Sequence, residues 1–276
     1  MSEFEPSEFT GDSPKAEREG LPAGYRMRAD PHYVELLSTP AKSDRGRGES
    51  PRPRDEHAGV RAARDRRLFE QLSEDINAIE SASAMLSADP SPLARRVSLD
   101  LIKAQSARAA WLLRAQGLSG AADPEPVTRT RPIGALLAQL RDRVSAECRL
   151  VGLTLQVATD DQTPVTIDDA LLLVGMTGAV LALTGMAAPG DGGTIRVQPI
   201  VAGGELQAIE ITEDAAPLTG SALQRFFDPS WTDRPGGWLA AMGASTARAA
   251  AERLGGTASV AALDRRGATI KLVVKT

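Results

Sequence analysis

The sequence has little cysteine and little histidine, and these shortages exclude several classes of protein. Its 276 residues include one cysteine, Cys148, and two histidines, His32 and His57. A single cysteine cannot form an intramolecular disulfide, and two histidines far from it do not make a Cys/His zinc module. No segment approaches the ~18 to 20 uninterrupted apolar residues of a membrane span, and the acidic start has no signal-peptide apolar run. We therefore expect a cytoplasmic protein without a metal site.

An excess of positive charge is also lacking. The chain has 32 Lys and Arg against 36 Asp and Glu, which gives a formal net charge of -4. Without a global positive field, nothing in the composition indicates nucleic acid or an anionic membrane as a partner. Apolar residues make up 42% of the chain, which is enough for a real core. We expect a globular protein of one or two domains.

The first 58 residues differ in composition from the rest. Residues 1–58 are rich in proline, glycine and charges of both signs, which predicts a disordered arm and linker. Within it, residues 25–37 gather both tyrosines and several aliphatic side chains. This island is either a short docking segment or a stray helical turn in a linker.

A helical hairpin is predicted over residues 59–118. Apolar residues recur at spacings of three and four up to Leu86, where Pro90 and Pro92 end the first helix. Ser91 and Pro92 then supply an N-cap and a first-turn proline for the second helix. The second helix has two apolar seams, one of Leu99, Ile102, Ser106, Ala109 and Leu113, the other of Val97, Leu101, Ala104 and Trp111. Two seams need two neighbours, which favours a homodimer with a shared four-helix core. The alternative is packing against the rest of the same chain.

Residues 127–276 alternate helical and strand patterns. Strands are expected at 153–157, 194–200, 206–211, 258–263 and 268–274, and helices at 133–148, 168–186 and 240–254. Glycine pairs and short polar turns separate the last four strands into two hairpins. This order predicts an α+β fold, a sandwich of a mixed sheet with helices on one face.

The order of these elements resembles the transmitter region of bacterial sensor histidine kinases, over roughly residues 60–276. Pro164–Asp168 before an apolar helix is similar to the family's entry to its ATP-binding layer. Residues 223–229 resemble its phenylalanine-rich box, and residues 235–256 resemble its second glycine box with the following helix. The resemblance implies a dimerising hairpin followed by an ATPase-type α/β sandwich.

The family's acceptor histidine is missing. Residues 69–76 resemble the family's acceptor run and place Glu74 where the phosphorylated histidine belongs. A carboxylate cannot form the phosphoramidate, and residues 58–276 contain no histidine at all. The resemblance therefore implies a degenerate, pseudokinase-like member with no catalytic residues.

The family's nucleotide site is also eroded. Thr177 and Leu181 stand at the positions that match its magnesium-binding asparagine. Asp214 matches its adenine-binding aspartate, and Gly237 and Gly243 are remnants of its phosphate loop. The alternative is that Asp214 is an ordinary strand-end carboxylate and the glycines belong to a loop and a helix start. We expect no cofactor, with ATP bound only if the chain is a divergent enzyme.

Three functions remain open at this point. The first is an inactive kinase-like protein that dimerises and binds a response-regulator receiver domain or a histidine kinase. The second is a divergent kinase or ATPase, and the third is a structural adaptor that acts through its N-terminal arm. For the first, the family's docking mode implies a contact surface formed by Leu72, Ser73, Glu74, Ile76, Arg95 and Arg96.

Overall fold

The computed structural model describes residues 53–88, 90–118, 127–187, 192–215, 218, 220–263 and 266–275, with side chains from residue 62 onward. The apolar island at residues 25–37 and nearly all of the predicted arm lie outside the described residues. Residues 54–276 form one compact unit. No described helix has the length and apolarity required to cross a bilayer.

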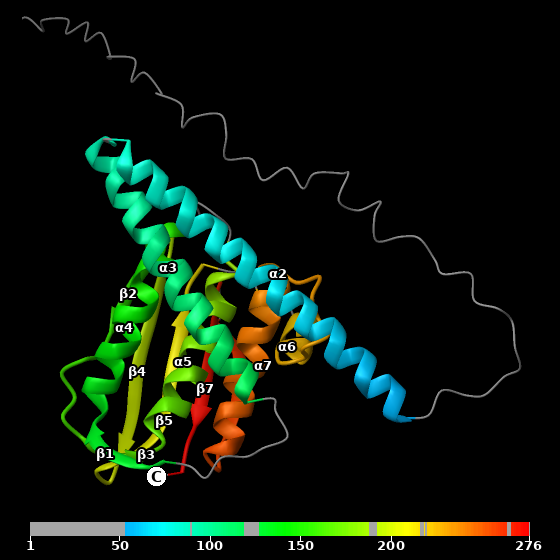
Figure 1. The fold of residues 1–276 in the computed structure, drawn as a ribbon. Coiled ribbons are helices and arrows are strands. Elements are labelled where there is room, and N and C mark those ends of the chain that lie inside the picture. Colours follow the sequence, from blue (N-terminus) through cyan, green and yellow to red (C-terminus); the bar gives the residue numbers. More distant parts are fainter. Residues whose placement is uncertain are drawn as a thin grey trace, which may run out of the picture. The chain divides into compact units, whose positions relative to one another are not determined.

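The predicted helical hairpin is present (Figure 1). Helix α2 spans Pro53–Ser87 and helix α3 spans Pro92–Gly117. The side-chain oxygen of Ser91 accepts a hydrogen bond from the backbone N–H of Ala94 at 3.3 Å, so it is the predicted N-cap. Helix α2 begins earlier than predicted, which is possible because proline is compatible with the first helical turn.

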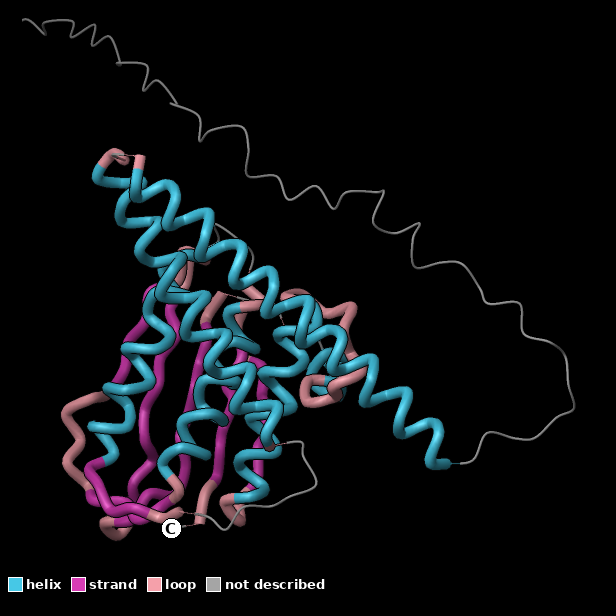
Figure 2. Tube along the Cα trace, in the orientation of Figure 1, coloured by secondary structure: helices cyan, strands magenta, loops and turns pink. Residues whose placement is uncertain are grey.

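A five-stranded mixed sheet forms one layer of the molecule (Figure 2). Its order is β2-β4-β5-β7-β6, and only the β2–β4 pair is parallel. The strands are β2 Thr154–Val157, β4 Thr194–Ala202, β5 Glu205–Glu213, β6 Thr257–Ala262 and β7 Ala268–Val273. Gly203 and Gly204 connect β4 to β5 with φ of 64° and 83°, left-handed values that glycine adopts without strain. Both predicted hairpins are confirmed.

Three helices cover one face of this sheet: α4 Ile133–Leu150, α5 Asp169–Thr184 and α7 Gly237–Arg253 (Figure 1). Leu137, Met176 and Ile209 are fully buried in the core between the two layers. The predicted α+β fold class is therefore confirmed.

Three short elements were not predicted. Strand β1, Arg129–Pro132, pairs antiparallel with strand β3, Pro164–Ile167. Strand β1 was not predicted because a four-residue strand of arginine, threonine and proline has no apolar alternation. Helix α6, Gly220–Arg225, is one short turn of helix before the loop that leads to α7.

The hairpin forms a third layer on top of the helices (Figure 1). A small apolar cluster joins it to α5 and α7: Leu68, Trp111, Leu112, Ala115, Val174, Leu181 and Met242. Helix α5 is apolar on nearly all sides because the sheet covers one side of it and the hairpin covers the other. The alternative packing, against the same chain, therefore holds for the inner face of the hairpin.

Candidate functional site

Trp111 anchors the inner face of the hairpin to α5. Its side chain is 2% exposed, and its indole N–H donates a hydrogen bond of 3.0 Å to the backbone oxygen of Val174. Its ring lies against Gly178, where a Cβ would come within 3.3 Å of ring atom Cζ2. A buried tryptophan with its polar atom satisfied stabilises a packed interface.

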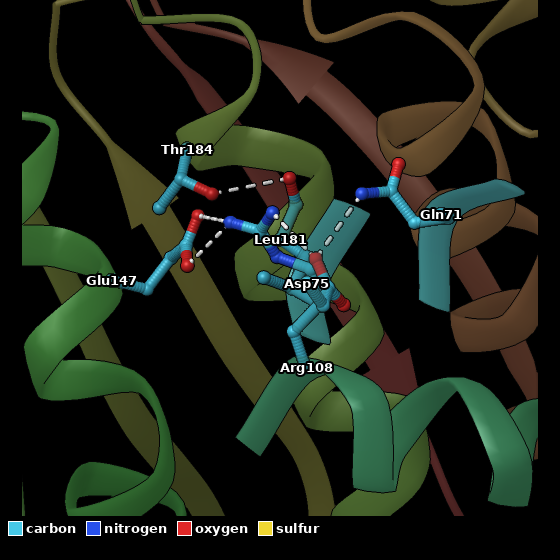
Figure 3. A network of polar contacts seen from close by, with 6 residues as sticks. All are labelled: Gln71, Asp75, Arg108, Glu147, Leu181 and Thr184. Carbon is cyan, nitrogen blue, oxygen red and sulfur yellow. Dashed lines mark hydrogen bonds and ion pairs between the residues drawn. The ribbon is translucent and has the colours of Figure 1, made fainter. Parts of the chain in front are cut away.

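A charged cluster lies between the two hairpin helices and α4 (Figure 3). Arg108 on α3 donates to both carboxylate oxygens of Glu147, at 2.6 and 2.7 Å. Its other terminal nitrogen lies 3.5 Å from Oδ1 of Asp75 on α2. Gln71 donates a hydrogen bond of 3.2 Å to the same oxygen of Asp75. One guanidinium therefore faces two carboxylates.

Asp75 is the most deeply buried carboxylate of this cluster. Its side chain is 1% exposed, and its Oδ2 has no hydrogen-bond partner among the described residues. Burial raises the pKa of Asp75 to about 6, although the nearby Arg108 opposes this rise. Asp75 therefore titrates close to neutral pH, within the contact between hairpin and sandwich.

A second ion pair joins the hairpin to α4. Arg149 donates to both oxygens of Asp100, through Nε at 2.9 Å and Nη2 at 2.6 Å. These hydrogen bonds hold the pKa of Asp100 below its ordinary value. Bidentate arginine–carboxylate pairs fix orientation as well as distance, so this pair sets how the hairpin lies on α4.

The outer face of the hairpin is open in the single chain. Exposed fractions are 67% for Phe69, 53% for Ile76 and 60% for Leu113. The first seam of α3 lies on this outer side, since Leu99 and Ser106 are exposed, whereas Ala104 and Trp111 of the second seam are buried. Large exposed apolar side chains that recur along one face are typical of an interaction surface.

Four of the predicted contact residues lie together on α2. Ser73, Glu74 and Ile76 are exposed, and Leu72 is half-buried against the apolar cluster under the hairpin. The hydroxyl of Ser73 donates to the backbone oxygen of Phe69 at 2.8 Å, which leaves the Glu74 carboxylate as the outward polar group.

The two predicted arginines of the contact surface lie elsewhere on the hairpin. Arg95 and Arg96 are exposed near the start of α3. The Asp75–Arg108 contact defines the level of Glu74 on α3, which is about 18 Å along the helix from Arg96 at 1.5 Å per residue. The structure does not bring these arginines next to Glu74.

The residues that match the nucleotide site make contacts within the fold. Oδ1 of Asp214 accepts a hydrogen bond of 2.6 Å from the backbone N–H of Thr194, and its Oδ2 lies 3.6 Å from Arg196. Asp214 therefore caps the start of β4. Gly237 has a φ of 57° and begins α7, after Gly236 as N-cap.

Gly243 lies in the contact between α5 and α7. A Cβ on it would come within 2.5 Å of the backbone oxygen of Gly178, and one on Gly178 would come within 2.6 Å of the Gly243 oxygen. Gly185 and Gly236 make a similar backbone approach at the end of α5. Glycine at these positions therefore allows the backbones of α5 and α7 to come into direct contact.

The loop before α7 is filled by its own side chains. The Arg234 guanidinium lies 4.5 Å from the ring centroid of Phe226 and 4.7 Å from that of Trp231. It donates a hydrogen bond of 2.7 Å to the backbone oxygen of Phe226. Burial lowers the pKa of Arg234 to about 10, so it stays charged at neutral pH.

The matched magnesium positions are both buried. The Thr177 hydroxyl donates to the Leu173 backbone oxygen at 2.7 Å, and Leu181 belongs to the apolar cluster under the hairpin. Among the described residues, no group of three or more His, Cys, Asp or Glu is arranged to bind a metal. Cys148 is fully buried, and burial raises its pKa to about 12, which leaves no reactive thiolate.

The sequence analysis did not predict the charged contacts between the hairpin and α4. One signal was present, because Asp75 lies between Leu72 and Ile79 along the apolar stripe of α2. Its partners Arg108 and Glu147 lie on other helices, and nothing in their local pattern links them.

Solved structures of sensor histidine kinases are similar to this chain. The catalytic domain of histidine kinase ThkA is 11% identical, with a TM-score of 0.43, over 54% of this chain and 95% of that domain. The Mycobacterial sensor histidine kinase MprB is 17% identical, with a TM-score of 0.42, over 54% of this chain and 97% of that one. The Acinetobacter baumannii histidine kinase AdeS is 13% identical, with a TM-score of 0.39, over 74% of this chain and 98% of that one.

No protein-family model matches the sequence, and no curated protein matches it either. With identities this low, the function of this chain has to be inferred from its own residues.

Proposed function

We propose that the chain is a catalytically inactive, histidine-kinase-like signalling protein. It dimerises through the outer face of its hairpin and binds a two-component partner, a receiver domain or a histidine kinase. The observation that carries this proposal is the two-sided hairpin. Its inner face is occupied by the chain's own sandwich, while its outer face presents Glu74 and apolar side chains to solvent.

The inactivity follows from the chemistry of single positions. Phosphoryl transfer to the hairpin needs an imidazole at the acceptor position, and the matching residue is Glu74. The histidine on α2, His57, lies in the first turns of this long helix and not at that position. Metal binding needs a polar ligand, and Leu181 is buried in an apolar cluster. Gly243 contacts the backbone of α5 rather than lining an open phosphate loop. The acceptor position and the matched Leu181 position therefore lack the atoms that the family's reaction requires.

Charge favours the pairing of two copies through this face. On α2, Glu70 and Glu74 are exposed, whereas on α3 the exposed charges include Arg95 and Arg114. In a two-fold bundle in which α2 of one copy lies beside α3 of the other, acidic side chains would face basic ones. Phe69, Ile76 and Leu113 would supply the apolar contact.

Calorimetric titration of the full chain against a panel of isolated receiver domains and kinase hairpin domains tests the partner. We expect at least one domain to bind with a micromolar dissociation constant. The Glu74→Arg variant should weaken binding about tenfold or more, because it reverses the charge of an exposed residue of the proposed contact surface. The matched control is Glu80→Arg, an exposed glutamate further along the same helix, which should bind as the unaltered chain does.

Two outcomes would contradict the proposal. One is that no domain of the panel binds. The other is that Glu74→Arg binds as well as the unaltered chain. Deletion of residues 1–52 tests the alternative that the chain is a structural adaptor acting through its N-terminal arm. If this deletion abolishes binding, the arm and not the hairpin binds the partner.

A further inference from the structure

A groove of about 730 Å³ lies between α3 and α4. Its volume falls within the ~300 to 1,000 Å³ of small-molecule sites, and the groove is open to solvent along one side. Its polar lining comes from both helices: Lys103 and Ser106 from α3, and Gln139, Arg143, Ser145 and Arg149 from α4. It lies away from the predicted contact residues, none of which lines it.

Cationic side chains outnumber carboxylates in the lining of the groove, where Lys103, Arg143 and Arg149 stand against Asp142. Lys103 and Arg143 form no ion pair within the part of the chain that the structure describes. Burial, and then the like charge of Arg114, lowers the pKa of Arg143. Asp142 also lines the groove, but its carboxylate lies 3.5 Å from Arg141, and Arg149 is held by Asp100. Lys103 lies near enough to Asp100 to help lower the pKa of that carboxyl, but neither Lys103 nor Arg143 has a carboxylate of the described residues within ion-pair distance.

Neutral donors face the same groove. The hydroxyls of Ser106 and Ser145 and the amide of Gln139 make no hydrogen bond to other described residues. Ile102 and Ala146 add an apolar part to the lining. The groove therefore combines two unpaired cations, three free hydrogen-bonding groups and an apolar floor.

We propose that this groove binds the phosphate group of a small organic phosphate ester. The terminal oxygens of a phosphate monoester accept several hydrogen bonds at once, which matches the guanidinium, ammonium and two hydroxyl groups of the residues that line the groove from two helices. The apolar floor accommodates the organic part of the ester. A ligand bound there contacts both the hairpin and the sandwich, so it stabilises the docked arrangement. The proposal does not rest on the partner-binding function proposed above, although Ile102 and Ser106 of the groove also belong to the outer seam of α3.

Calorimetric titration of the full chain with phenyl phosphate and with inorganic phosphate, at constant ionic strength set by NaCl, tests the proposal. We expect saturable binding of phenyl phosphate, with weaker binding of inorganic phosphate because it lacks the apolar part. Arg143→Gln and Lys103→Gln should each weaken binding about tenfold, the effect of one charge-assisted hydrogen bond. Arg141→Gln is the matched control, because Arg141 is exposed on the same helix and does not line the groove.

The proposal is overturned if neither probe gives saturable heat, or if inorganic phosphate binds more tightly than phenyl phosphate. Unchanged affinity in Lys103→Gln, whose exposed side chain can be replaced without harm to the core, also overturns it. An equal loss in Arg141→Gln would show attraction by general surface charge and not a site. Binding of an acidic peptide, such as oligoglutamate, without binding of either phosphate would assign the groove to a protein partner instead.

Discussion

At the scale of single residues, the stability of the chain depends on an excess carboxylate under the hairpin. Asp75 and Glu147 share the single guanidinium of Arg108, and Glu74 adds further negative charge nearby. The folded state therefore holds the Asp75 proton more tightly than the unfolded chain does. Stability from this group is complete below the ordinary carboxyl pKa of about 4 and is lost as the pH rises through about 6.

Asp75→Asn should stabilise the chain at neutral pH. The amide keeps the shape of the side chain and its contact with Gln71 but carries no buried charge. We expect a gain of about 2 kcal/mol at pH 7.5, or roughly 5 °C in Tm, which shrinks to nothing near pH 4. Thermal unfolding across this pH range measures it, with Glu80→Gln as an exposed control. A variant that is less stable at pH 7.5 would show that the carboxylate contributes more to the cluster than its burial costs.

Asp100 should have the opposite dependence on pH. Its pKa is held low by Arg149, so its contribution is present above the ordinary carboxyl pKa and is lost as the pH falls through the lowered value. As the pH rises, Asp75 therefore weakens the contact between hairpin and sandwich, whereas Asp100 strengthens it.

At the scale of elements, the contact between α5 and α7 depends on glycine. Gly243→Ala places a methyl group against the Gly178 backbone oxygen, which cannot move aside like the end of a flexible side chain. We expect a loss of about 1 to 3 kcal/mol in the free energy of unfolding. Urea denaturation measures this loss. Gly117→Ala is the control, since nothing lies within 4 Å of a Cβ there and its effect should be near zero or stabilising. Equal stability of the two variants would mean that α5 and α7 do not touch at Gly243.

Periodicity predicted most elements because the apolar spacing of a helix or strand is local. The hairpin, its Ser91 cap and both strand pairs follow from patterns within about 20 residues. Strand β1 has no such pattern and was missed. Asp214 and Gly243 have structural uses that depend on where β4 and α5 pass, and no local spacing contains that information. The same applies to Asp75, whose partners lie on two other helices.

At the scale of the whole molecule, the open outer face of the hairpin predicts a dimer. We expect light scattering to give twice the chain mass at tens of micromolar. Ile76→Asp combined with Leu113→Asp should give a monomer, because each loses an apolar contact worth about 1.5 to 3 kcal/mol and gains an unpaired charge in the interface. Both side chains are more than half exposed in the single chain, at 53% and 60%, so the variant should still fold.

Leu93→Asp is the control for the dimer, since Leu93 is 68% exposed but lies at the start of α3, off the outer seam. It should leave the dimer intact. If the unaltered chain is a monomer, or if the doubly substituted chain stays dimeric, the outer face of the hairpin is not the dimer interface.

The proposed function requires that the chain binds partners and has no nucleotide chemistry, and calorimetric titration of the full chain with ATP and Mg²⁺ is the decisive experiment. We expect no saturable heat and no rise in Tm at millimolar ATP, because Leu181 and Gly243 are packed between helices and no histidine lies in residues 58–276. A micromolar dissociation constant for ATP, accompanied by acid-labile, base-stable label from radioactive ATP, would contradict it.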